Sequence, residues 1–60
     1  MKNIKQLREL KGLTQQELAT RAGIGLATLS RLELGKCTPN KSTIAVIASA
    51  LEVEPGEIKI

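Results

Sequence analysis

The chain has 60 residues, a net charge of +3, one cysteine, and neither histidine nor any aromatic residue. A chain this short makes a single domain and leaves little room for a closed catalytic pocket. Without histidine it lacks the commonest general base and metal ligand, and without aromatic side chains it cannot bind nucleic acid by base stacking. The composition therefore predicts no enzyme, no bound metal and no cofactor, and it favours a binding function.

The single cysteine, Cys37, cannot form an internal disulfide bond. Small secreted domains usually depend on disulfides, so we expect a reducing compartment and interpret Cys37 as an ordinary loop thiol. No apolar run approaches the roughly 20 residues of a membrane span. The sequence thus predicts a soluble, cytoplasmic protein.

The basic residues gather in the first part of the chain. Residues 1–36 hold seven basic and three acidic residues, a net +4, whereas residues 37–60 hold two basic and three acidic residues, a net −1. A basic N-terminal portion suits a polyanionic partner such as nucleic acid.

The first expected helix spans about residues 2–11. Ile4, Leu7 and Leu10 recur at every third position and predict one apolar stripe along this helix. Gly12 follows at the position where helices commonly end in a left-handed residue.

The second expected helix spans residues 15–22. The segment Thr14–Glu17 reads TQQE, a capping box in which the threonine hydroxyl and the glutamate carboxylate each accept a backbone N–H bond. Ala19 and Ala22 form a narrow face of small residues that lets another helix approach, and Gly23 ends the helix.

The third expected helix spans residues 26–34, and only Gly23–Gly25 separate it from the second. Leu29 and Leu32 face inward, and Gly35 closes the helix. With that pair inward, the outward positions are Leu26, Ala27, Ser30, Arg31 and Leu34.

The fourth expected helix spans residues 41–51 and begins after Asn40, a good N-cap. A short fifth helix is expected over residues 55–59, opened by Pro55. The inward positions of these two helices are Ile44, Ile47, Ala48, Leu51 and Ile58. Short helices with a tight, glycine-containing turn between the second and the third predict an all-α helix-turn-helix fold in one domain over residues 1–60.

Several stretches carry a family resemblance. The sequence resembles the phage repressor/Cro-type (XRE) helix-turn-helix family in TQQELA at residues 14–19, Gly23, TLSRLELGK at residues 28–36, Pro39 and ASALEV at residues 48–53. The resemblance covers about residues 4–58. It implies a lambda-repressor-like domain of five short helices that binds operator DNA, usually as a symmetric dimer on a palindrome.

The resemblance also implies roles for individual residues by matching position. Base edges would be contacted by Leu26, Ala27 and Arg31. Phosphates would be contacted by Gln15, Thr28, Ser30, Lys36 and Thr38. Arg8 and Glu33 would form a structural ion pair. Dimerisation would use the segments around the fourth and fifth helices, which offer Val46, Val53, Pro55 and Ile60.

The residues themselves support part of this assignment. Arg31 is the one outward group that can pair with guanine through two hydrogen bonds. Leu26 and Ala27 donate no hydrogen bond, but they can pack against the methyl group of thymine. The N-terminal amides of the second helix, at Gln15 and Gln16, can hold a phosphate without help from side chains.

These observations predict a sequence-specific, double-stranded-DNA-binding transcriptional regulator of the repressor type. It would act as a homodimer on a palindromic operator. One alternative is an antitoxin or restriction-controller protein of the same fold. The other alternative is a protein-interaction module that has lost DNA recognition. The apolar outward residues Leu26, Ala27 and Leu34 favour this alternative. If Leu26 and Leu34 were buried against another chain, the domain could not recognise DNA in that state.

Overall fold

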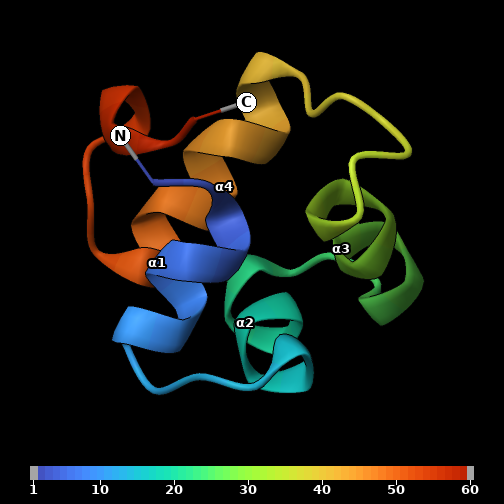
Figure 1. Ribbon diagram of the computed structural model, residues 1–60, viewed down its shortest axis with the longest axis horizontal. Coiled ribbons are helices and arrows are strands. Elements are labelled where there is room, and N and C mark those ends of the chain that lie inside the picture. Colours follow the sequence, from blue (N-terminus) through green and yellow to red (C-terminus); the bar gives the residue numbers. More distant parts are fainter. Residues whose placement is uncertain (1, 60) are drawn as a thin grey trace.

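The structure is a computed structural model that describes residues 2–59. Within those residues the fold is all-helical, with four α-helices and one short 3-10 turn (Figure 1). The elements are α1 (Ile4–Leu10), α2 (Gln15–Ala22), α3 (Leu26–Glu33), α4 (Lys41–Leu51) and the 3-10 turn η1 (Pro55–Glu57). The expected all-α class is confirmed.

The first helix begins later than the sequence indicated. Asn3 caps α1: its side-chain Oδ1 accepts the Gln6 backbone N–H at 2.8 Å, and its own N–H donates to Gln6 Oε1 at 2.9 Å. Lys2 lies outside the helix, and its carbonyl accepts the Lys59 N–H at 2.9 Å. The prediction that helix one starts at residue 2 is wrong, because an Asn-x-x-Gln capping box fixes the start at Ile4.

The expected short fifth helix over residues 55–59 is present as a shorter 3-10 turn. A 3-10 turn spans Pro55–Glu57, and Ile58 is extended, with φ −90° and ψ 122°. This backbone buries the Ile58 side chain, which is 4% exposed, and brings Lys59 beside Lys2. The third helix ends one residue earlier than expected, with Leu34 as its C-cap.

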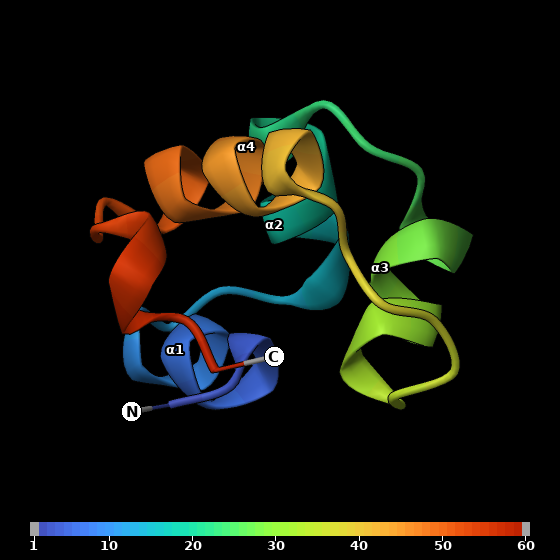
Figure 2. The same ribbon diagram turned by 90° about the horizontal axis from the view of Figure 1, so that it is seen from above.

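The core is aliphatic and draws on all four α-helices. Its four largest fully buried side chains are Leu18, Leu29, Ile47 and Leu51. Burial of each stabilises the fold by roughly 1.5–3 kcal/mol. Helix α2 packs against both α3 and α4, and α1 packs against α3 and α4. Figure 2 shows α3 standing at one side of the molecule.

Leu10 does not belong to the buried apolar stripe of α1, contrary to the expectation from the sequence. Ile4 and Leu7 are buried at 5% and 6% exposure, but Leu10 is 64% exposed. Each step of three residues rotates about 60° short of a full turn, because each residue turns the helix by about 100°. Two such steps carry Leu10 about 120° away from Ile4 and out of the core.

Candidate nucleic-acid interface

The turn between α2 and α3 is built from small residues and backbone hydrogen bonds. Gly23 adopts a left-handed conformation with φ 73°, which glycine accepts without strain. The next residue, Ile24, donates its N–H to the Ala19 carbonyl at 3.0 Å. Ala19 is itself 1% exposed. The chain therefore passes from α2 to α3 within three residues, and α3 packs against α2.

The start of α2 carries the expected capping box. Thr14 Oγ1 accepts the Glu17 N–H at 3.1 Å, and the Thr14 N–H donates to Glu17 Oε1 at 2.9 Å. These bonds lower the pKa of Glu17 below its ordinary value. The box satisfies the amides of Thr14 and Glu17. The first two helical amides, at Gln15 and Gln16, have no partner within an α-helix, so they can donate to an acceptor from outside the helix.

A polar junction, formed by Arg8, Leu13, Gln15 and Glu33, ties α1, α2 and α3 together. Arg8 Nε donates to Glu33 Oε2 at 2.7 Å, and Arg8 Nη2 donates to Glu33 Oε1 at 3.2 Å. Arg8 Nη1 donates to the Leu13 carbonyl at 2.8 Å. The structure thus places the expected ion-pair partners in direct, two-point contact.

The polar junction is largely shielded from water. The side chains of Arg8 and Glu33 are 12% and 2% exposed. The hydrogen bond to Glu33 raises the pKa of the Arg8 guanidinium, which desolvation opposes. Because Glu33 lies at the end of α3 and Arg8 lies on α1, the pair fixes the orientation of α3 on the body of the domain.

The side chain of Gln15 makes a contact within the domain that the sequence did not indicate. Its Nε2 donates to Glu33 Oε1 at 3.0 Å, so the side chain expected to contact a phosphate is already part of the polar junction. The amide retains its second N–H and its carbonyl oxygen. The observation favours the backbone N–H groups of α2 as the main donors to an anion at this end. No sequence motif links Gln15 to Glu33, which lies 18 residues away.

The side of α3 that faces away from Leu29 and Leu32 is open. We call Leu26, Ala27, Ser30 and Arg31 the recognition face. Leu26 is 43% exposed, Ala27 and Arg31 are exposed, and Ser30 is half-buried. Leu29, on the inward side, is 0% exposed. The structure therefore brings the three residues expected to contact bases onto one accessible side of one helix.

The comparisons with known proteins agree with this architecture. The profile of the helix-turn-helix family matches residues 4–58. This chain belongs to the helix-turn-helix family. It is 41% identical over 56 residues, 93% of this chain and 73% of the relative, to a protein named uncharacterized HTH-type transcriptional regulator y4dJ from Sinorhizobium fredii (strain NBRC 101917 / NGR234).

A second relative of this helix-turn-helix domain is named uncharacterized HTH-type transcriptional regulator RghRB, from Bacillus subtilis (strain 168). The identity is 41% over 51 residues, 83% of this chain but 37% of the relative. The domain therefore corresponds to a minor part of that longer protein. No solved structure matches the chain.

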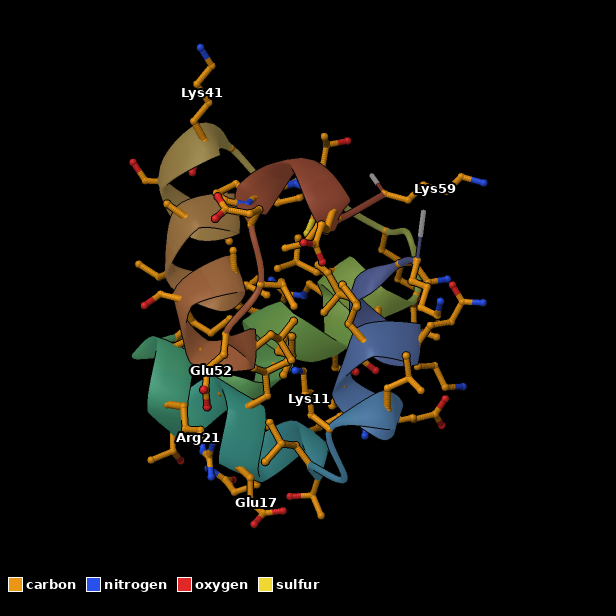
Figure 3. The ribbon with its side chains drawn as sticks, turned by 90° about the vertical axis from the view of Figure 1, so that its left-hand side faces the viewer. Lys11, Glu17, Arg21, Lys41, Glu52 and Lys59 are labelled. Carbon is orange, nitrogen blue, oxygen red and sulfur yellow. The ribbon has the colours of Figure 1, made fainter. Side chains whose placement is uncertain are left out.

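The remaining residues expected to contact phosphates flank the recognition face of the helix-turn-helix domain. Thr28 is exposed in the first turn of α3, and Lys36 and Thr38 are exposed in the loop that follows α3. The Lys36 N–H donates to the Arg31 carbonyl at 2.9 Å, so this loop stays close to the end of α3. Figure 3 shows Glu17 and Arg21 projecting from the α2 end of the domain, and Lys41 projecting from the opposite end.

The residues expected to support dimerisation differ in how far their side chains are exposed to solvent. Val46 is 39% exposed, and Pro55 is exposed. Val53 is half-buried against the core. Ile60 lies outside the described residues. Only Val46 and Pro55 thus offer open side chains among the described members of this set.

Two other findings concern the described residues alone. Within residues 2–59, no three histidine, cysteine, aspartate or glutamate side chains lie where they could hold a metal ion. No helix in that range is long and apolar enough to cross a membrane.

Proposed function

We propose that this domain binds double-stranded DNA in a sequence-specific manner and acts as a transcriptional repressor by occupying its operator. One observation carries the proposal: α3 follows a tight turn, is braced by α2, and presents an open face that includes its one cation, Arg31. The one acid of α3, Glu33, is held in the polar junction, where it does not oppose an approaching phosphate backbone.

The docking follows from the arrangement of the two helices. The N-terminal part of α3 enters the major groove, which is about 12 Å wide and admits one helix. The amides at the start of α2 bind a backbone phosphate, and Gln15 adds its remaining N–H. Thr28, Ser30, Lys36 and Thr38 contact phosphates on the two sides of the groove. Phosphate contacts position the domain, and Leu26, Ala27 and Arg31 read the bases.

The size of the domain supports a homodimer on a palindromic operator. Its principal-axis extents are 23 × 23 × 18 Å. Successive major grooves on one side of DNA lie about 34 Å apart, so a single copy cannot read two of them. Two copies related by a twofold axis place two α3 helices in successive grooves. Val46 and Pro55, near the C-terminal half of the domain, are the candidate contacts between copies.

The proposal is tested by selecting binding sites from random DNA duplexes and then titrating salt. We expect an enriched inverted repeat whose half-sites lie about one helical turn apart. The logarithm of the binding constant should fall linearly with the logarithm of salt concentration, with a slope of about −0.9 per neutralised phosphate. Binding without any enriched half-site would contradict sequence-specific recognition.

One observation favours a second candidate function. Leu26 and Leu34, at 43% and 67% exposure, both lie open on α3. A protein-interaction module would use this apolar surface to bind another chain. The same selection separates the two functions, because an interaction module enriches no duplex. An antitoxin or restriction-controller protein would instead enrich a site, and its distinguishing property would be the partner encoded beside it.

A further inference from the structure

We propose that the recognition face reads its half-site through thymine methyl groups and one guanine, and makes no amide pair with adenine and no carboxylate pair with cytosine. This inference rests on the proposed function, since it assigns base chemistry to the same face. It concerns which bases are recognised, and it can fail while DNA binding itself holds.

The N-cap and the first two residues of α3 carry no hydrogen-bonding side chain. Gly25, the N-cap, makes no side-chain capping bond, and it is followed by Leu26 and Ala27. Leu26 is 43% exposed and is therefore available to a ligand, whereas Leu29 on the same helix is fully buried. A base edge placed against these three residues gains apolar contact only. Among the four bases, thymine alone offers a methyl group in the major groove.

Helix α3 itself carries no amide side chain, and its one carboxylate, Glu33, is bonded within the polar junction. Adenine is typically read by an amide side chain, and cytosine by a carboxylate. The amide of Gln15 donates to Glu33 at 3.0 Å, and both carboxylate oxygens of Glu33 accept from Arg8 or Gln15. The Glu33 side chain is 2% exposed, so it does not reach a base.

Arg31 is therefore the polar side chain of α3 that can distinguish one base from the others. It is exposed, and its guanidinium fits the O6 and N7 acceptors of guanine. The hydroxyls of Thr28 and Ser30 bind several base edges without strong preference. Ala27 and Arg31 are one turn apart on the same side of the helix, about 6 Å along its axis. That distance is about two base steps of 3.4 Å. The guanine should therefore lie within about two base pairs of a thymine.

The test uses the duplex enriched by the selection, with single-atom or single-group changes. Replacing each thymine of the half-site by deoxyuridine removes only the methyl group. We expect the affinity to fall by about fourfold for each methyl group in contact, the value of one buried carbon. Replacing the guanine by 7-deazaguanine removes the N7 acceptor, and should weaken binding by about fivefold or more. The same replacements outside the half-site are the control.

Two leucine variants link the methyl effect to the recognition face. Leu26→Ala should lose the response to deoxyuridine at the thymine that Leu26 contacts, because the side chain that packs on that methyl group has been shortened. Leu34→Ala, the matched change at the other end of α3, should keep the full fourfold response. Both leucines are exposed, so neither change should unfold the domain.

The outcomes separate this inference from the proposed function. Failure to bind any duplex would overturn both. Tight binding to a selected site that is unaffected by deoxyuridine would overturn the methyl readout and leave DNA binding intact. An enriched half-site without guanine, or equal binding of guanine and 7-deazaguanine, would overturn the role given to Arg31.

Discussion

The two ends of α3 invert the usual distribution of side chains. At the C-terminal end, the polar junction shields the charges of Arg8 and Glu33 from water. At the N-terminal end, the recognition face exposes Leu26 and Ala27 to water. Charged residues are rarely buried unless paired, and removing one member of such a pair leaves the other charge without its partner. The C-terminal end therefore holds α3 in position, and the N-terminal end is open to a ligand.

The largest expected effect comes from breaking the polar junction. Glu33→Ala leaves the buried Arg8 guanidinium without its carboxylate, and should cost about 3–5 kcal/mol of unfolding free energy. A 60-residue domain has a total of only about 3–9 kcal/mol, so much of the variant should be unfolded at 25 °C. Urea denaturation followed by circular dichroism measures the difference.

A matched control for this variant is Glu57→Ala, which removes an exposed carboxylate. It should change the unfolding free energy by less than about 0.5 kcal/mol. Equal stability of Glu33→Ala and Glu57→Ala would show that the polar junction contributes little to the fold.

Removing the cation of the recognition face should affect binding and not stability. Arg31→Ala should weaken binding to the selected duplex by about 1–3 kcal/mol, because the pair with guanine is lost. Its unfolding free energy should stay within about 0.5 kcal/mol of the wild type, since Arg31 is exposed. Fluorescence anisotropy with a labelled duplex measures the affinity.

The control for Arg31→Ala is Arg21→Ala, which removes an exposed arginine that projects from α2 (Figure 3). It should retain the preference for the selected site over a scrambled one. If both arginine variants lost the same affinity for both duplexes, Arg31 would contribute charge alone and no base recognition.

A smaller effect is expected at the start of α2. Thr14→Ala removes the hydroxyl that accepts the Glu17 N–H, and should destabilise the domain by about 1 kcal/mol. Ser42→Ala, at an exposed position in the first turn of α4, should have little effect. Thermal unfolding of the two variants compares them, and an unchanged melting temperature for Thr14→Ala would argue against the capping bond.

The smallest effect is a pH dependence at the same cap. The bonds from Thr14 lower the pKa of Glu17 in the folded domain. The carboxylate therefore contributes stability at pH values above the ordinary pKa of glutamate, and this contribution disappears as the pH falls through the lower folded pKa. Glu17→Gln should lose that part of the acid dependence. Identical stability profiles of wild type and variant between pH 7 and pH 2 would contradict the assignment.

Features set by local chemistry could be predicted from the sequence. The capping box at Thr14, the N-cap at Asn40 and the left-handed Gly12, Gly23 and Gly35 follow from residue type and position, and the structure has them all. Glu52, which ends α4 with φ 59°, could not be predicted in this way, because glutamate rarely adopts that conformation.

Features that depend on packing between distant segments could not be predicted. The bond from Gln15 to Glu33 depends on how α2 meets α3, which no local pattern encodes. The extended backbone at Ile58 depends on the pairing of Lys2 with Lys59 across the whole chain. The candidate base-contacting residues came from the family resemblance by matching position, and the inward-facing pair Leu29 and Leu32 supported their outward placement.

The most direct test of the account is a nuclear magnetic resonance titration of the labelled domain with the selected duplex. We predict that backbone amide shifts will change mainly at Gln15–Gln16, at Gly25–Arg31 and at Lys36–Thr38. The opposite result would be changes confined to the groove lined by Lys2, Leu7, Leu10, Lys11, Val53, Gly56 and Glu57, while α3 stays unperturbed. That pattern would place the ligand on the other side of the domain and contradict a recognition role for α3.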